Sequence, residues 1–286
     1  MIQITVPEAH KRFVQFLKDK KKASSTILAY GKDIEQLATF LAKKSITELG
    51  SITSEALDEF KNGLLSDGYT AKSVSRKINS LKTFFRYAKG EDFLEANPAT
   101  SISHPKYQVS PPRILTKLEY RALRDACRED KRIAAIVELM LQTGIRIGEV
   151  ANLLLEDVRG DKLYIRPFES HSERTVPLNK AAQQALSRYL EVRPESKSKA
   201  LFITKTGRPL LTRNIRTAID RFFRLAGIEG AKVNDLRHTF IAHHLASGTS
   251  PLVMSQLVGH KRLSTTEKYL QIVRGDSAGN VKLDEL

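Results

Sequence analysis

Four residues in the second half of the chain have the types and the order that metal-free phosphoryl transfer requires. Arg146 comes first, Arg237 follows within an Arg-His step, and His260 stands after a glycine, nine residues before Tyr269. A tyrosine hydroxyl can attack a phosphodiester and form a phosphotyrosine ester, which conserves the bond energy so that a strand is rejoined without ATP. Arginine suits the developing charge because its planar fork donates two parallel hydrogen bonds and stays charged. These residues predict phosphodiester cleavage and rejoining with no cofactor.

Three stretches carry these residues. They read TGIRIGEVANLL over 143–154, NDLRHTFIAHHLASG over 234–248, and LVGHKRLSTTEKY over 257–269. In their order and spacing they resemble the tyrosine recombinases of the phage integrase family. Within the last stretch, Ser264 and Glu267 fit a capping box that would start a short helix and present Tyr269 about one turn in.

The resemblance implies a role for each residue. Tyr269 would attack the DNA phosphate, and Arg146 and Arg237 would hold its non-bridging oxygens. His260 would donate to a phosphate oxygen or help to move the tyrosine proton. Glu149, the glutamate of the TGxRxxE pattern, would orient a neighbouring donor without touching the phosphate.

Two positions depart from the family's pattern. Asn234 stands where the second box usually begins with histidine, and an amide can bind a phosphate but cannot move a proton. The family also places a lysine in the turn between two strands, ahead of a stretch like ERxVPL. Here ERTVPL, residues 173–178, follows PFESHS, which contains no lysine. The acid for the leaving 5′ oxygen is therefore open, and Lys162, before the turn, and His171, within it, are the two candidates.

The composition favours a polyanionic partner. With 47 Lys and Arg against 32 Asp and Glu, the 286 residues carry a formal net charge of +15, which points first to nucleic acid. A membrane surface is the rival, but the chain shows no signal peptide, long apolar span or polybasic anchor, so we expect a cytoplasmic protein with no membrane partner. The single cysteine, Cys127, excludes an internal disulfide and a thiolate zinc cage, so no metal is expected and the thiol should be inert.

The first hundred residues predict a small helical bundle. Apolar residues recur at spacings of three and four along single faces. One predicted helix carries Val74, Ile78, Leu81, Phe85 and Ala88, and a longer one carries Ile27, Ile34, Leu37 and Leu41. Thr70, Thr53 and either Ser24 or Ser25 are the expected N-caps of three helices.

A proline-containing segment separates this bundle from a second domain. Residues 101–113 include Pro105, Pro111 and Pro112, which interrupt helices and leave an extended linker. Residues 114–286 predict a mixed domain with helices over 116–130, 132–142 and 146–155 and short strands over 162–167, 174–177 and 200–204. The expected fold is a two-domain, mainly α protein, with an N-terminal helical bundle and an α+β domain that contains a small antiparallel sheet.

The resemblance extends to the architecture and the partner. It implies a SAM-like core-binding domain and a catalytic domain that clamp double-stranded DNA at specific core sites. It also implies a dimer that becomes a tetramer on DNA, with the C-terminal tail docked on a neighbouring protomer and strands exchanged through a Holliday junction. Lys72, Arg76, Lys77 and Lys82, on the last predicted helix of the bundle, would contact phosphates.

Several biological roles fit this interpretation. The chain could integrate or excise DNA, or resolve dimers or cointegrates of replicons, and the two departures in the active-site set favour a mobile element. Two alternatives remain at the level of sequence. One is a DNA-binding protein on the same scaffold that has lost strand cleavage, and the other is a type IB topoisomerase, which relaxes DNA of any sequence.

Overall fold

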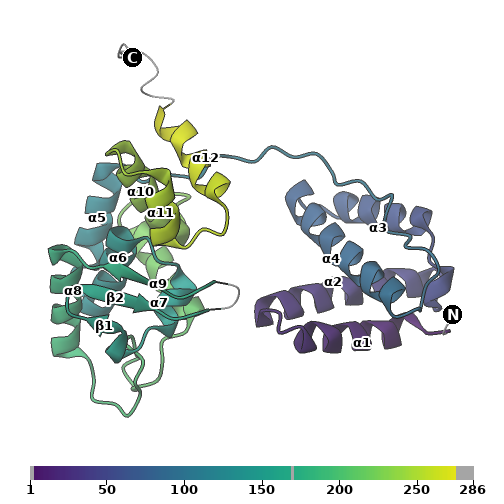
Figure 1. The fold of residues 1–286 in the computed structure, drawn as a ribbon, viewed down its shortest axis with the longest axis horizontal. Coiled ribbons are helices and arrows are strands. Elements are labelled where there is room, and N and C mark those ends of the chain that lie inside the picture. Colours follow the sequence, from purple (N-terminus) through teal and green to yellow (C-terminus); the bar gives the residue numbers. More distant parts are fainter. Residues whose placement is uncertain (1–2, 169–170, 275–286) are drawn as a thin grey trace. The chain divides into compact units, whose positions relative to one another are not determined.

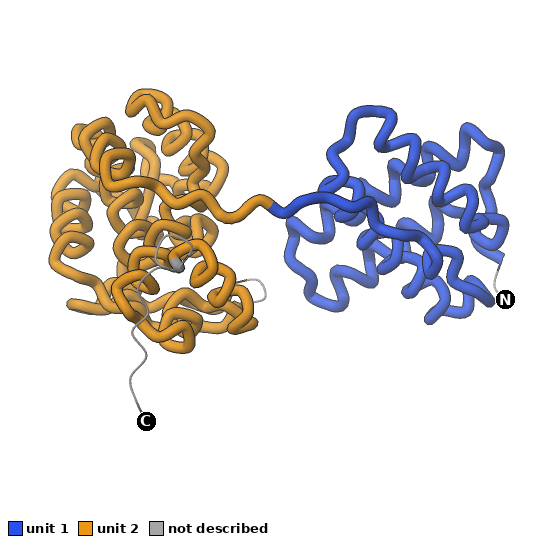
Figure 2. Tube along the Cα trace, turned by 90° about the horizontal axis from the view of Figure 1, so that it is seen from above, with its two compact units in different colours: residues 1–109 blue, residues 110–286 orange. Residues whose placement is uncertain are grey.

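The computed structural model describes residues 3–168 and 171–274. The chain divides into two compact units, Met1–Val109 and Ser110–Leu286, which are coloured separately in Figure 2. Ile102 belongs to the segment predicted as linker, yet it is buried in the core of the first unit. Within the described part, no helix is long and apolar enough to cross a membrane.

In its described residues, 3–109, the N-terminal unit is a bundle of four α-helices. They are α1 (Val6–Asp19), α2 (Ser24–Lys43), α3 (Ser54–Ser66) and α4 (Ala71–Gly90), with a short 3-10 turn at Leu49–Ser51. The predicted apolar face of α4 is buried along its whole length, which confirms the spacing argument. Thr53 and Thr70 cap α3 and α4 as predicted. The prediction of a serine cap for α2 is wrong: Ser24 is already helical, and Ala23 occupies the cap position without a side-chain hydrogen bond.

A buried carboxylate fixes α4 against α2. Asp33, on α2, accepts hydrogen bonds from Arg76 Nη1 at 2.6 Å and Nη2 at 2.9 Å, from Lys77 Nζ at 2.9 Å and from Ser80 Oγ at 2.6 Å. Burial would raise the pKa of Asp33, but these donors outweigh it and hold the pKa below its usual range. A charge so buried needs such partners, so the network sets the register between the two helices.

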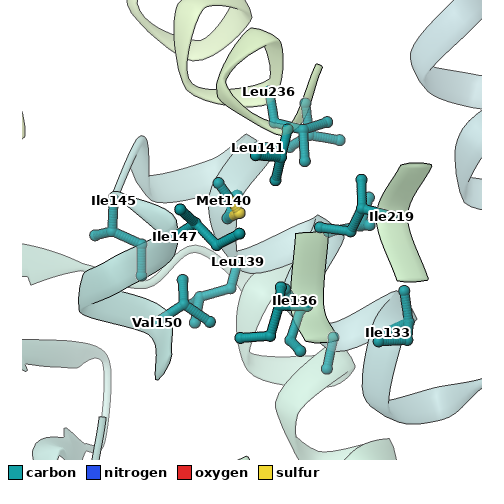
Figure 3. Close-up of a cluster of buried hydrophobic side chains, with 14 of the residues drawn as sticks. Ile133, Ile136, Leu139, Met140, Leu141, Ile145, Ile147, Val150, Ile219 and Leu236 are labelled. Atoms are coloured by element: carbon teal, nitrogen blue, oxygen red, sulfur yellow. The ribbon is translucent and has the colours of Figure 1, made fainter. Parts of the chain in front are cut away.

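Over residues 110–168 and 171–274, the C-terminal unit contains eight α-helices and a small sheet (Figure 1). The helices are α5 (Lys117–Cys127), α6 (Lys131–Thr143), α7 (Ile147–Asn152), α8 (Lys180–Val192), α9 (Thr212–Leu225), α10 (Val233–Ala246), α11 (Pro251–Val258) and α12 (Leu263–Arg274), with a 3-10 turn at Leu155–Asp157. The apolar α6 lies in the middle. Its side chains pack against Ile147 and Val150 of α7, Ile219 of α9 and Leu236 of α10 (Figure 3). Cys127 is buried, and burial raises the pKa of its thiol to about 11, as expected of an inert thiol.

The sheet has three antiparallel strands in the order β1 (Val158–Arg159), β2 (Lys162–Ile165) and β3 (Arg174–Pro177). Lys162 pairs with Pro177 at one end of the β2–β3 hairpin, and Ile165 pairs with Arg174 at the other. The predicted strand over 200–204 is wrong, because residues 200 and 203 form only isolated bridges. A side chain binds part of this backbone: the Tyr189 hydroxyl donates to the carbonyl of Leu201 at 3.2 Å and accepts from the N–H of Ile203 at 3.1 Å.

Candidate active site

A tight turn delivers Arg146 to the site. Gly144 ends α6 in the left-handed conformation, with φ 62°, and a Cβ at this position would collide with the ring of Phe240. Only glycine adopts this conformation at little cost, so the Thr-Gly pair in the sequence is a requirement of the turn. Arg146 then becomes the N-cap of α7, where its backbone N–H donates to Glu149 Oε2 at 2.8 Å.

Arg146 and Arg237 meet at one carbonyl. The oxygen of Val258, at the C-terminus of α11, accepts from Arg146 Nη1 at 3.2 Å and from Arg237 Nη2 at 2.8 Å. Arg146 Nη2 also donates to the carbonyl of Gly259 at 2.7 Å, and Arg237 Nη1 donates to that of Gly144. The two guanidinium groups are therefore adjacent, as a pair that grips one phosphate must be.

Arg237 is a buried cation with neutral partners. The residue is 6% exposed, and among the described residues its side chain hydrogen-bonds only to carbonyl oxygens. Burial, reinforced by the charge of Arg146, lowers the pKa of Arg237 to about 9, and burial also lowers the pKa of Arg146. Placing two cations side by side without two anions is unfavourable, so the site has a strong electrostatic preference for an anion.

Glu149 is the carboxylate of this cluster, and it is bound by a residue that the sequence argument did not select. Arg174, at the start of β3, donates from Nη1 and Nη2 to Glu149 Oε1 and Oε2, both at 2.8 Å, and from Nε to the carbonyl of Leu257 at 2.9 Å. Burial would raise the pKa of Glu149, but the donors of Arg174 and Arg146 lower it to about 2. The sequence offered one indirect signal for Arg174, the arginine of ERTVPL. If Glu149 is buried, it needs a cationic partner.

His260 and Tyr269 face each other. Their rings are 6.3 Å apart and nearly parallel, at 20°. His260 Nδ1 lies 2.8 Å from Thr266 Oγ1, so the second threonine of the TT pair fixes the ring. Burial and the charges of Arg237 and Arg146 lower the pKa of His260 to about 4. Burial raises the pKa of Tyr269, while the charges of the same two arginines act in the opposite direction.

The helix that carries the tyrosine begins earlier than predicted. α12 starts at Leu263, so Ser264 lies within the helix and the prediction that it opens a capping box is wrong. Tyr269 is 6% exposed and packs in an apolar cluster with Phe240, Met254 and Val258. Figure 1 shows α10, α11 and α12 together at one end of the unit. Tyr269 on α12 and Arg237 on α10 therefore lie on helices that pack against each other.

Three other residues were predicted to belong to the site: Asn234, Lys162 and His171. Asn234 is exposed in the first turn of α10, three residues before Arg237 and so on the same face of the helix. Lys162 is exposed at the end of β2 that lies away from the hairpin tip. His171 is half-buried in the hairpin, where the charges of Arg146 and Glu149 act on it.

Two of the four predicted DNA contacts in the N-terminal unit need correction. Lys77 is buried, and its ammonium group donates to Asp33 and to Gln36, so it is not available to a phosphate. Arg76 keeps an exposed edge but gives two hydrogen bonds to the same carboxylate. Lys72 is exposed and Lys82 half-exposed, and both remain predicted phosphate contacts.

Comparison with known families agrees with the geometry. A model described as "Phage integrase family" matches residues 113–274, and one described as "Phage integrase, N-terminal SAM-like domain" matches residues 11–92. The chain belongs to the phage integrase family. The two matches correspond to the two structural units, and the family's catalytic model spans Arg146, Arg174, Arg237, His260 and Tyr269.

Relatives within the family are recombinases. The chain is 29% identical to tyrosine recombinase XerD of Staphylococcus aureus over 94% of both chains. It is 32% identical to tyrosine recombinase XerC of Thermodesulfovibrio yellowstonii over 91% of this chain and 90% of that one. A lambda integrase dimer bound to a COC′ core site has the same fold, with a TM-score of 0.77 and 19% identity over 92% of this chain and 97% of that one.

Proposed function

We propose that this protein is a site-specific tyrosine recombinase that cuts and rejoins DNA through a 3′-phosphotyrosine intermediate and a Holliday junction. The observation that carries the proposal is the charge around Tyr269. Arg146 and Arg237 both act on Tyr269, while Glu149 is the carboxylate partner of Arg146 and Arg174 but not of Arg237, which leaves a partly buried excess of positive charge beside a buried tyrosine. A phosphodiester supplies the missing anion.

The clamp suggests how the phosphate is held. Arg146 and Arg237 now donate to carbonyl oxygens at the ends of α6 and α11, which are neutral acceptors. A phosphate oxygen carries more charge and makes stronger hydrogen bonds with guanidinium groups, so it can replace those carbonyls. Once bound, the phosphate offsets the repulsion between the two cations, and the growing charge of the transition state strengthens the same contacts.

The tyrosine is kept protonated until the substrate arrives. Its raised pKa means that the free protein contains little phenolate, so the nucleophile is inactive without DNA. During attack, Tyr269 Oη forms a bond to phosphorus and its proton leaves to His260 or to solvent. Burial lowers the pKa of His260 and keeps the imidazole neutral, so one ring nitrogen can accept this proton. Asn234, three residues before Arg237 on α10, would bind a phosphate oxygen, but its amide cannot move a proton.

The proposal includes the partners. The net charge of +15 suits double-stranded DNA, and the binding site is expected to be a specific core sequence. Lambda integrase has been solved as a tetramer bound to a Holliday junction, and we propose that this chain likewise assembles from dimer to tetramer on DNA. Docking of the C-terminal tail on a neighbouring protomer is part of this proposal, although residues 275–286 lie outside the described part of the chain. We propose that recombination takes place in the cytoplasm. It would serve either the resolution of replicon dimers or the movement of a mobile element.

Covalent capture tests the proposal and identifies the target sequence in the same experiment. The full-length protein is incubated in EDTA with a pool of nicked duplexes that contain a randomised segment, and protein-linked DNA is recovered under denaturing conditions and sequenced. The matched control is Tyr269→Phe, which keeps the ring and removes the nucleophile. We expect adducts from the wild type alone, with one enriched sequence and one scissile position.

Other outcomes would favour the alternatives. DNA binding by the wild type without any adduct would support a DNA-binding protein that has lost cleavage. Adducts spread over all sequences, together with relaxation of any supercoiled plasmid, would support a type IB topoisomerase. Cleavage that EDTA abolishes would contradict the metal-free mechanism.

A further inference from the structure

Cleavage leaves one chemical role unfilled. The 5′ oxygen departs as a poor leaving group unless it receives a proton, and neither Arg146 nor Arg237 is suited to supply one and remain a clamp. Lys162 is badly placed, because it pairs with Pro177 at the far end of the hairpin from Arg174. Ile165, at the tip end of β2, lies three positions after Lys162, which is about 10 Å along the strand. The donor must therefore come from another part of the site.

The β2–β3 hairpin is anchored to the active site on both of its sides. On the β2 side, the ring of Phe168 packs against Gly148 of α7, where an added Cβ would lie 2.9 Å from Phe168 Cε1. On the β3 side, Arg174 binds Glu149 of α7 and the carbonyl of Leu257 in α11. The hairpin tip is thus held beside the start of α7, where Arg146 lies.

His171 lies between these two anchors. Its backbone N–H donates to the carbonyl of Phe168 at 3.0 Å, and its carbonyl accepts from the N–H of Phe168 at 3.1 Å, so its place in the hairpin is fixed. The side chain is half-buried. Nδ1 is enclosed and has no hydrogen-bond partner among the described residues. An imidazole with no internal partner at such a position is available to a substrate atom.

We propose that His171 is the general acid of the cleavage step, in the place of the lysine that the hairpin lacks. This inference rests on the proposed recombinase function. Tyr269 Oη bonds to phosphorus, the bond from phosphorus to the 5′ oxygen breaks, and the 5′ oxygen takes the proton from Nε2 of His171. A free 5′ hydroxyl and a neutral imidazole result. In the rejoining step the same nitrogen takes the proton back as the 5′ hydroxyl attacks the phosphotyrosine and the tyrosine leaves.

The protonation of His171 depends on bound DNA. Among the described residues, the ionisable groups that act on it are Arg146 and Glu149 at the start of α7, Arg174 of β3, and His260 and Lys261 after α11. Burial and then the charge of Arg146 lower its pKa in the free protein, so the imidazole is neutral at pH 7. A phosphodiester held by Arg146 brings a negative charge next to the ring, which favours the imidazolium. Bound substrate therefore raises the fraction of His171 that carries the proton.

A leaving-group substitution tests this role directly. Two nicked duplexes carry the captured site, one with the normal 5′ oxygen at the scissile bond and one with sulfur in its place. A thiolate leaves without a proton, because a thiol has a pKa of about 8.5, far below that of an alcohol. Single-turnover adduct formation is measured for the wild type, His171→Ala and His171→Asn. Lys162→Ala and Lys261→Ala serve as lysine controls.

The expected pattern is specific to proton donation. Both His171 variants should cleave the oxygen substrate about 10²–10⁴-fold more slowly than the wild type, and the sulfur substrate at close to the wild-type rate. The lysine controls should keep the wild-type ratio between the two substrates. His171→Lys should restore cleavage of the oxygen substrate and extend it to higher pH than the wild type allows.

The outcomes separate this inference from the proposed function. If His171→Ala and His171→Asn slow both substrates equally, His171 is a structural residue and the inference fails. If sulfur rescues Lys261→Ala instead, the acid is Lys261. If the wild type forms no adduct with either substrate while Tyr269→Phe behaves identically, the proposed function itself fails.

Discussion

Arg174→Ala is the substitution that most directly tests the electrostatic role of the buried ion pair. The Arg174 side chain is 9% exposed and that of Glu149 is 1% exposed, so their two hydrogen bonds at 2.8 Å are made out of water. Removing the guanidinium leaves Glu149 with Arg146 as its charged partner, through Nη1 at 3.0 Å. Glu149 would then draw Arg146 away from the phosphate, so DNA cleavage should fall together with stability.

Two independent arguments give the same size for the effect. Truncating one partner of a buried ion pair costs about 3–5 kcal/mol. Independently, donors that hold the pKa of Glu149 at about 2, against an ordinary value of 4.5, stabilise the folded protein by about 3 kcal/mol at neutral pH, and Arg174 is the largest of these donors. Because the folded-state pKa is depressed, this stability is present above pH 4.5 and is lost as the pH falls from 4.5 to about 2. We therefore expect a loss of about 3 kcal/mol at pH 7 that shrinks across that acid range.

Urea unfolding of the full chain, followed by circular dichroism because the protein has no tryptophan, measures this loss. A core substitution in the C-terminal unit, Ile136→Ala, identifies which unfolding transition belongs to that unit, because only that transition should shift. The matched control is Arg128→Ala, which removes an ion pair whose side chains are 69% and 65% exposed and should cost under about 1 kcal/mol. If Arg174→Ala loses as little stability as the control, or if its loss is unchanged in acid, the ion pair does not have the role assigned to it.

Three further predictions concern the elements that position the site. Gly144→Ala should destabilise the C-terminal unit by about 1–2 kcal/mol, because of the positive φ, and slow covalent capture of DNA because the new Cβ displaces Phe240; unchanged capture would contradict this. Tyr189→Phe should cost about 1–3 kcal/mol in urea unfolding, since the N–H of Ile203 loses its acceptor, and leave adduct formation unchanged. Asp33→Ala should lower the free energy of unfolding by about 3–5 kcal/mol, because the buried ammonium of Lys77 loses its carboxylate. The loss should appear in the unfolding transition of the N-terminal unit, and a shift in the other transition would be inconsistent with this prediction.

Short-range patterns in the sequence predicted much of this protein. The helical face of α4, the caps Thr53 and Thr70, and the two strands of the β2–β3 hairpin follow from spacings of two to four residues. Such spacings are set by backbone hydrogen bonds between near neighbours, so they can be recognised without knowing the rest of the fold. The error at 200–204 arose where a distant side chain, the Tyr189 hydroxyl, binds part of the backbone, which the local pattern does not reveal.

The chemistry could be inferred from the sequence alone, because the Thr-Gly turn before an arginine and the Gly-His pair nine residues before a tyrosine resemble the motifs of the tyrosine recombinases. Only the packing of the folded chain shows which charged side chains are available to bind a phosphate. Arg174 binds Glu149 across 25 residues, and Lys77 binds Asp33 across 44. Whether a cation faces solvent, a phosphate or a buried carboxylate depends on which helices pack together. That packing is set by burial of whole apolar faces, which a motif a few residues long does not encode.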